Sequence, residues 1–114
     1  MLNTPSSSFL LSTSASGQIQ NVAVVVSRNN RQKAVQWLTD VLWTVELLAA
    51  QPNIGAIYRL ENPQLHSLRR YRVRNHRAYW IYFRPFASGN GIEVFAVLHE
   101  RQNIGEQLEE ALEL

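Results

Sequence analysis

The chain has no cysteine and almost no lysine. Without cysteine, disulfide bridges and thiolate metal sites are excluded, and stability must come from packing. Of the 11 basic residues only Lys33 is a lysine, and the others are arginines. Because the guanidinium group is planar and makes bidentate contacts, this usage favours recognition of carboxylate or phosphate over a diffuse positive coat.

Long apolar runs are also missing. The purely aliphatic run Val22 to Val26 is far shorter than the roughly 20 residues that span a bilayer. The stretch from Met1 to Gly17 lacks the basic start and the long apolar segment of a secretion signal. We therefore expect a soluble, cytoplasmic protein.

The length and the composition indicate one globular domain. The 114 residues are too few to divide into two domains, and 46% hydrophobic with 18% charged residues is ordinary for a folded chain. Residues 1–8 are small and polar, so we predict a flexible N-terminus followed by a single domain over residues 9–114.

Charge is distributed unevenly, although the formal net charge is only +2. Between Arg59 and Arg84 there are seven arginines and one acid, Glu61. From Glu93 to the end there are six acids and one base, Arg101. The sequence therefore predicts a basic middle followed by an acidic tail.

The clearest predicted element is a helix over residues 31–50. Asn29 or Asn30 is a suitable N-cap, and Pro52 prevents continuation beyond the end. Trp43 and Leu47 lie beside the main apolar stripe and indicate either additional core contacts or a second apolar surface. The stripe itself recurs at helical spacing and consists of Ala34, Trp37, Leu38, Val41, Leu42, Val45, Leu48 and Ala49.

The remaining segments predict mainly strands. Residues 13–27 are ambiguous, since β-branched residues favour a strand and the length favours a helix. In the strand 68–74, Tyr71 and Val73 share one face while Arg70, Arg72 and Arg74 share the other. The further predicted elements are strands at 9–12, 79–84 and 92–99, a hairpin connection at 85–91 and a helix at 103–114.

The sequence offers little for conventional catalysis. There is no Gly-x-Ser-x-Gly elbow and no phosphate-binding loop. The histidines His66, His76 and His99 lack the short spacing of a metal site and have no thiolate partners. We therefore expect no metal and no cofactor.

Several strings resemble the ParE branch of the RelE/ParE toxin superfamily, over about residues 9–106. The densest is Tyr71 to Pro85 (YRVRNHRAYWIYFRP), followed by Gly91 to Val94 and Val97 to His99, with Gln51 to Gly55 upstream. Three features depart from the family pattern. Residues 13–27 carry no charge, Ala96 stands where an arginine is common, and Glu100 stands where a glycine is common.

The resemblance implies an α+β fold in which a helical hairpin packs on a small antiparallel sheet with a short C-terminal helix, in the order β-α-α-β-β-β-α. It also places a helix over the ambiguous segment. By the same resemblance the chain is the toxin of a type II toxin-antitoxin system, binds DNA gyrase and is neutralised by a ParD-like antitoxin in a hetero-oligomer. The related alternatives are a ribosome-dependent mRNA endonuclease like RelE and a non-toxic relic that still binds the antitoxin.

These functions imply specific site residues. An arginine-rich strand face suits an acidic protein or phosphate, and the expected target-binding residues are Arg70, Arg72, Arg74, Arg84, His99 and Arg101. For RNA cleavage the candidate catalytic residues are Arg74, Arg84 and His99. The expected docking points for the antitoxin are Trp37, Trp43 and Leu47.

Overall fold

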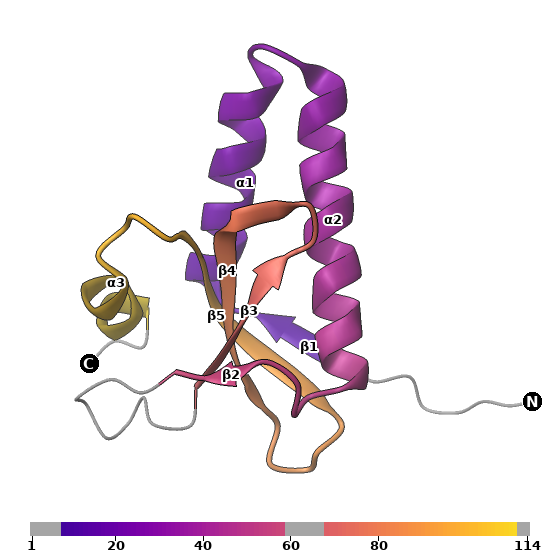
Figure 1. Ribbon diagram of the computed structural model, residues 1–114, viewed down its shortest axis with the longest axis vertical. Coiled ribbons are helices and arrows are strands. Elements are labelled where there is room, and N and C mark those ends of the chain that lie inside the picture. Colours follow the sequence, from indigo (N-terminus) through magenta and orange to yellow (C-terminus); the bar gives the residue numbers. More distant parts are fainter. Residues whose placement is uncertain (1–7, 59–67, 112–114) are drawn as a thin grey trace, which may run out of the picture.

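The computed structural model describes residues 8–58 and 68–111 (Figure 1). These residues form a five-stranded sheet, a helical hairpin that follows the first strand, and a short third helix after the last strand. The elements are β1 (Ser8–Leu11), α1 (Thr13–Ser27), α2 (Arg31–Ala50), β2 (Ala56–Ile57), β3 (Arg69–Val73), β4 (His76–Pro85), β5 (Gly91–His99) and α3 (Ile104–Ala111). The predicted α+β fold class is confirmed.

Helix α1 resolves the segment that local signals left open. Ser12 is its N-cap, and the Ser12 hydroxyl accepts a hydrogen bond from the Ala15 amide at 3.0 Å. Ala15, Ile19 and Ala23 are four residues apart and buried, so the small and branched side chains form one continuous helical face. Tertiary packing of this face therefore outweighs the strand propensity of the valine run.

Helix α2 begins where the sequence predicts. Asn30 is the N-cap, and its side-chain oxygen accepts a hydrogen bond from the Lys33 amide. The helix ends at Ala50, and Gly55, with a φ of 90°, makes the exit turn that follows Pro52.

The buried stripe of α2 is narrower than predicted. Leu38 and Leu42 belong to the predicted apolar stripe, but they are 43% and 49% exposed and lie outside the core. The two leucines lie at the edge of the apolar stripe, and the rest of the protein covers only the face of α2 that is centred on Trp37, Val41 and Val45.

The sheet has the strand order β1-β5-β4-β3-β2. Strands β3 to β5 are paired antiparallel as expected, and β2 pairs antiparallel with β3. Strand β1 pairs parallel with β5, because the helical hairpin carries the chain across the sheet before the meander begins. Strand β2 was not predicted. Two residues are too few to leave a pattern in the sequence, and only the pairing of Ala56 with Arg70 and Ile57 with Arg69 identifies it.

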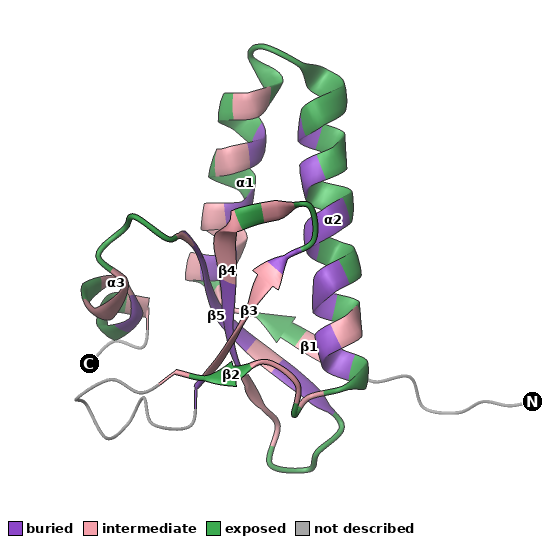
Figure 2. Ribbon diagram, viewed as in Figure 1, coloured by how far each residue is buried: buried purple, intermediate pink, exposed green. Residues whose placement is uncertain are grey.

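The sheet is covered unequally on its two faces (Figure 2). Helices α1 and α2 bury one face in the main core, which includes Trp37, Val45 and Ile81. Helix α3 covers part of the other face through Leu108, which packs with Tyr82 and Leu98 in a second cluster. Strands β4 and β5 therefore contribute buried side chains to both faces, as their sequences predict.

The two ends of the chain are only partly described. Ser8 was predicted to belong to the flexible N-terminus, but it is the first residue of β1. The rest of that predicted segment, residues 1–7, lies outside the described residues. The last helix is described as Ile104–Ala111, and residues 112–114 of the predicted helix also lie outside.

Candidate functional site

Two arginines of β3 stack on one tryptophan of β4. Arg72 and Trp80 are opposite each other in the β3–β4 pairing, and the Cζ atoms of both Arg70 and Arg72 lie 4.1 Å from the Trp80 ring centroid. Arg70 also lies over the ring of Tyr58, at 4.7 Å. These cation–π contacts restrict the guanidinium groups, so the two positive charges are oriented before any ligand arrives.

Arg72 has further partners within the protein. Its Nη1 donates a hydrogen bond to the carbonyl oxygen of Arg77, and it lies 3.7 Å from Oε2 of Glu100. The Arg72 and Glu100 side chains are 41% and 49% exposed, so this ion pair is weak and screened by solvent.

Arg74 lies beyond the end of β3 and contacts a different element. The β3–β4 register shifts between Arg72 and Val73, and the guanidinium of Arg74 stacks over the Trp43 ring of α2 at 4.3 Å. The Arg74 amide donates to Oγ1 of Thr44 at 3.0 Å. The expectation that Arg74 continues the row of Arg70 and Arg72 is therefore wrong, although all three arginines border the same hollow.

This hollow has a volume of about 500 Å³ and lies between α2, β2 and the β3–β4 hairpin. We call it the arginine–tryptophan groove. Its lining residues are Trp43, Gly55, Ala56, Arg70, Tyr71, Arg72, Val73, Arg74 and Trp80. The described residues that line it include three cations and two indole rings but no acid, which makes it a positively charged, partly aromatic surface.

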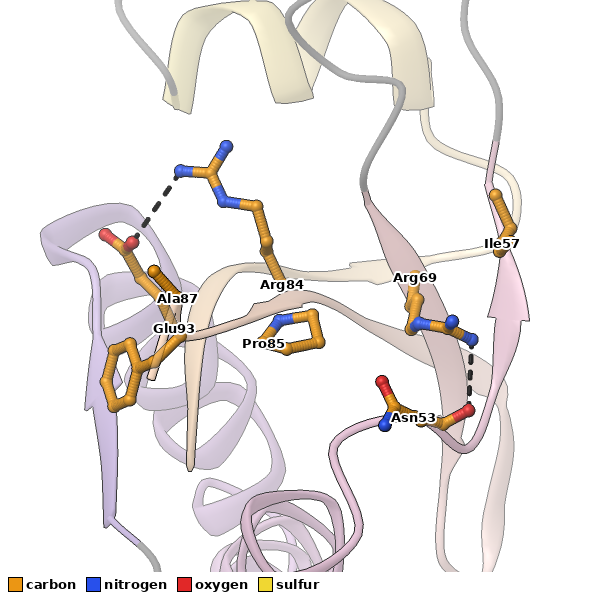
Figure 3. Close-up of a pocket in the computed structure, with 8 residues that line it drawn as sticks. Asn53, Ile57, Arg69, Arg84, Pro85, Ala87 and Glu93 are labelled. Carbon is orange, nitrogen blue, oxygen red and sulfur yellow. Dashed lines mark hydrogen bonds and ion pairs between the residues drawn. The ribbon is translucent and has the colours of Figure 1, made fainter. Parts of the chain in front are cut away.

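A second hollow, of about 580 Å³, lies at the other end of the sheet (Figure 3). Both of its arginines are directed to internal partners. Arg84 lies 3.9 Å from Oε1 of Glu93 and over the Phe95 ring, and Arg69 donates to the carbonyl oxygen of Asn53 at 3.0 Å. The positive charge is therefore partly compensated in both hollows, but an acid, Glu93, lines only this one, and no described acid lines the arginine–tryptophan groove.

His99 and Arg101 form a local motif at the end of β5. Nδ1 of His99 accepts a hydrogen bond from the Arg101 amide at 3.1 Å, and the His99 ring packs edge-on against Tyr79. Tyr79 packs against the core between the sheet and the helical hairpin, whereas Arg84 contacts Phe95 in the cluster under α3. The structure therefore does not bring together the residues considered for RNA cleavage: Arg74, Arg84 and His99 have separate neighbours.

Of the three expected docking residues, only Trp43 is clearly exposed. Trp37 is 1% exposed, and its indole N–H donates to the carbonyl oxygen of Ile19 at 3.0 Å, so its side chain is not accessible to a partner in the free chain. Leu47 is half-buried and Trp43 is 47% exposed. Other aliphatic side chains of the two helices are also exposed, namely Val24, Val25, Val35, Leu38 and Leu42.

One polar cluster was not anticipated from the sequence. The Asp40 side chain of α2 is 3% exposed, and it accepts hydrogen bonds from Gln36 and Asn75 and lies 2.9 Å from Nε2 of His76. Burial alone raises the pKa of the Asp40 carboxyl group, but the hydrogen bonds from Gln36, His76 and Asn75 outweigh it and hold the pKa below 3.8. In the sequence, this cluster is indicated only by the position of Asp40, an acid three residues after Trp37 on the buried side of an apolar helix.

Other kinds of site are missing from the part of the chain that the structure describes. No group of three or more His, Asp or Glu side chains lies close enough to hold a metal ion. No described helix is long and apolar enough to cross a membrane.

A helical hairpin on one face of a five-stranded sheet, with a short third helix on the other, is the architecture of a ParE-like α+β protein. The solved structure titled "Chromosomal ParDE TA system from P. aeruginosa" contains a chain that aligns with a TM-score of 0.63. The alignment covers 84% of this chain and 98% of that one at 18% sequence identity, so this likeness concerns the fold.

The family is shown by a match between the sequence and a protein-family model. The model described as "ParE toxin of type II toxin-antitoxin system, parDE" matches residues 9–104, which is most of the chain. The protein therefore belongs to the ParE toxin family, and the resemblance identified from its strings is confirmed. No curated protein matches the chain.

Proposed function

We propose that this ParE-family toxin acts by binding DNA gyrase. The observation that carries the proposal is the arrangement of Arg70, Arg72 and Arg74 around the arginine–tryptophan groove, where aromatic rings hold the guanidinium groups in place. Prealigned arginines make strong bidentate contacts with carboxylate or phosphate at low entropic cost. Such a surface suits a gyrase–DNA complex, which offers both groups, and a target of this kind requires action in the cytoplasm.

We further propose that a ParD-like antitoxin covers the outer face of the helical hairpin. Val35, Leu38 and Leu42 are three, four and seven residues apart on α2, so they form one exposed apolar stripe, and Trp43 lies beside it. An amphipathic helix that lays its apolar face on such a stripe is a common mode of peptide recognition. The docking site then consists of these four residues, and Leu47 contributes at its edge.

The direct test uses purified gyrase and a relaxed plasmid. We expect the toxin to inhibit supercoiling and to increase the amount of cleaved DNA that is trapped on the enzyme. The double variant Arg70→Ala/Arg72→Ala is expected to lose at least ten-fold in potency, because charge-assisted contacts each contribute about 1.5–3 kcal/mol. The control variant Arg28→Ala/Arg31→Ala removes the same charge at the tip of the helical hairpin, where both residues are exposed.

Two other results would contradict the proposal. If the toxin leaves gyrase unaffected and its induction in a bacterium stops methionine incorporation before thymidine incorporation, the chain is an RNA endonuclease instead. If induction changes neither process while the antitoxin still binds, the chain is a relic. The separate neighbours of Arg74, Arg84 and His99 favour the gyrase mechanism over RNA cleavage.

The buried position of Ala96 rules out a simple mutational test of the hypothesis that the chain is a non-toxic relic. Ala96, which stands where the family often has an arginine, is completely buried and packs in the cluster with Tyr82 and Leu108. An arginine at this position would have to displace α3. Loss or gain of toxicity in Ala96→Arg would therefore report on the fold as well as on the function.

A further inference from the structure

We propose that the arginine–tryptophan groove is a binding site for single-stranded nucleic acid. The inference rests on the geometry of the groove and not on gyrase, so either proposal can fail while the other holds. Arginine side chains would hold the phosphates, and the exposed indole and guanidinium planes would stack with the bases.

The spacing of the β3 arginines suits a nucleic acid backbone. Arg70 and Arg72 are two residues apart on one strand, which separates their Cα atoms by about 6.6 Å. This separation is comparable with that of neighbouring phosphates in an extended single strand. Both guanidinium groups are stacked on Trp80, so their N–H groups project from the edges of the stack. A phosphate can accept hydrogen bonds from them there.

Aromatic rings favour nucleic acid over an acidic peptide. An acidic peptide would satisfy the arginines, but it would leave the part of Trp43 that Arg74 does not cover, 47% of the residue surface, without a matching partner. Bases match both features, since every base has a flat face that stacks on an aromatic ring or a guanidinium plane. Trp43 and Trp80 line the same groove from α2 and β4, and Gly55 and Ala56 add no bulky side chain between them.

The same argument selects a single strand over a duplex. In a duplex the bases are stacked on one another and are not free for Trp43, whereas a single strand can turn its bases outward. The hollow of about 500 Å³ accepts individual nucleotides and not a complete double helix.

Among the described residues, Glu100 is the acid that pairs with an arginine of the groove, and it supplies an internal test. Glu100 lies 3.7 Å from Nη1 of Arg72, so it competes with a phosphate for that charge. Glu100 is half-exposed, and its replacement by glutamine leaves the packing intact. We therefore expect Glu100→Gln to bind a single strand more tightly than the unaltered chain, whereas Glu46→Gln, which removes an exposed acid from α2, should increase binding less.

Fluorescence anisotropy with labelled oligonucleotides of about 12 nucleotides tests the site. Oligothymidylate, oligouridylate and a DNA duplex of equal length are titrated with the purified toxin at several salt concentrations. We expect both single strands, or one of them, to bind at least ten-fold more tightly than the duplex. The comparison of thymidylate with uridylate decides whether the natural strand is DNA or RNA.

Variants separate the groove from general positive charge. Arg72→Ala should lose about ten-fold in affinity and reduce the salt slope by about 0.7, as expected for one lost phosphate contact on a single strand. Trp43→Ala should lose about five-fold or more with an unchanged salt slope, because the ring contributes stacking and no charge. Arg31→Ala, with an equal loss of charge at the start of α2, is the matched control.

The proposal is overturned if Arg72→Ala and Arg31→Ala weaken binding equally, or if the duplex binds as tightly as the single strands. Either result would mean that the oligonucleotide responds only to the net charge. Glu100→Gln keeps the test decisive if Arg72→Ala does not fold. An exposed glutamine does not disturb the packing, and the predicted effect of this variant is a gain in affinity for the single strand.

Discussion

The buried carboxylate of Asp40 lies 2.9 Å from Nε2 of His76, and this contact fastens the β3–β4 turn to the middle of α2. Asn75, with a φ of 64°, also donates to Asp40 from this turn, and Thr44 bridges the Asp40 carbonyl and the Arg74 amide. Arg74 therefore stands on a turn that is held at several points. The cluster positions one wall of the arginine–tryptophan groove without contacting a ligand itself.

Replacement of Asp40 by asparagine should destabilise the protein in a pH-dependent way. At neutral pH we expect a loss of about 1–3 kcal/mol, because the charge-assisted hydrogen bonds become ordinary ones in a buried position. The folded pKa of Asp40 is lowered below 3.8, so its carboxylate stabilises the fold above that pH, and this contribution disappears as the pH falls through the folded pKa. Thermal unfolding followed by circular dichroism from pH 7 to pH 2 measures the effect.

The gap in unfolding free energy between the unaltered chain and Asp40→Asn should therefore be constant near neutrality and narrow below about pH 4. Glu46→Gln is the control, because Glu46 is exposed on the same helix and its replacement removes one negative charge outside the buried cluster. A gap that stays constant down to pH 2 would show that the asparagine acts through packing and not through the lost charge.

The exposed stripe of α2 leads to a prediction about the antitoxin. Leu38→Glu/Leu42→Glu should reduce antitoxin affinity at least ten-fold, since it places two charges in an apolar interface. Both leucines are about half exposed, so the melting temperature of the free toxin should change little. Isothermal titration calorimetry with the antitoxin measures the affinity.

Two charges placed elsewhere provide the comparison for that experiment. Ala87→Glu/Ser88→Glu introduces the same charge at the exposed β4–β5 connection, away from the helical hairpin. If this variant loses as much affinity as Leu38→Glu/Leu42→Glu, the antitoxin responds to overall charge and the stripe is not its docking site.

The sequence predicts the backbone of this protein better than its surfaces. Helix α2 and strands β4 and β5 were predicted because their apolar patterns are long and regular. Helix α1 needed the family resemblance, since its valines are equally suited to a strand. The exposure of Leu38 and Leu42 was not predictable, because helical spacing defines a broad apolar stripe and the neighbouring elements decide which part of it is covered.

The candidate site was predictable only in part. The alternation in β3 correctly separates Arg70 and Arg72 from Tyr71 and Val73. Their stacking partners, Tyr58 and Trp80, come from other segments of the chain, and a register shift that no sequence rule marks turns Arg74 towards α2. Long-range contacts of this kind require the folded structure.

Gly91 permits the close approach of β1 to β5. Its φ is 123°, and a Cβ atom at this position would overlap the carbonyl oxygen of Ser8. We therefore expect Gly91→Ala to destabilise the protein by about 2 kcal/mol or more, through backbone strain and the overlap together. Urea denaturation of the variant gives the loss in unfolding free energy.

Gly89→Ala separates the two causes. Gly89 also has a positive φ, of 83°, but a Cβ atom there would meet nothing within 4 Å. This variant should lose only about 1–2 kcal/mol, the cost of the left-handed conformation. An equal loss in both variants would mean that β1 moves away from Gly91 at no cost, and that the β1–β5 pairing contributes little to stability.

Gly17 leads to a prediction of the opposite sign. It lies inside α1, has no positive φ, and an added Cβ atom would meet nothing within 4 Å. Alanine restricts the unfolded chain and fits the helix, so Gly17→Ala should stabilise the protein by about 0.5–1 kcal/mol. A rise of a few degrees in melting temperature at pH 7 would confirm it. A fall in melting temperature would contradict this prediction. Antitoxin binding by Gly17→Ala would then show whether a partner approaches the helix closely at this glycine.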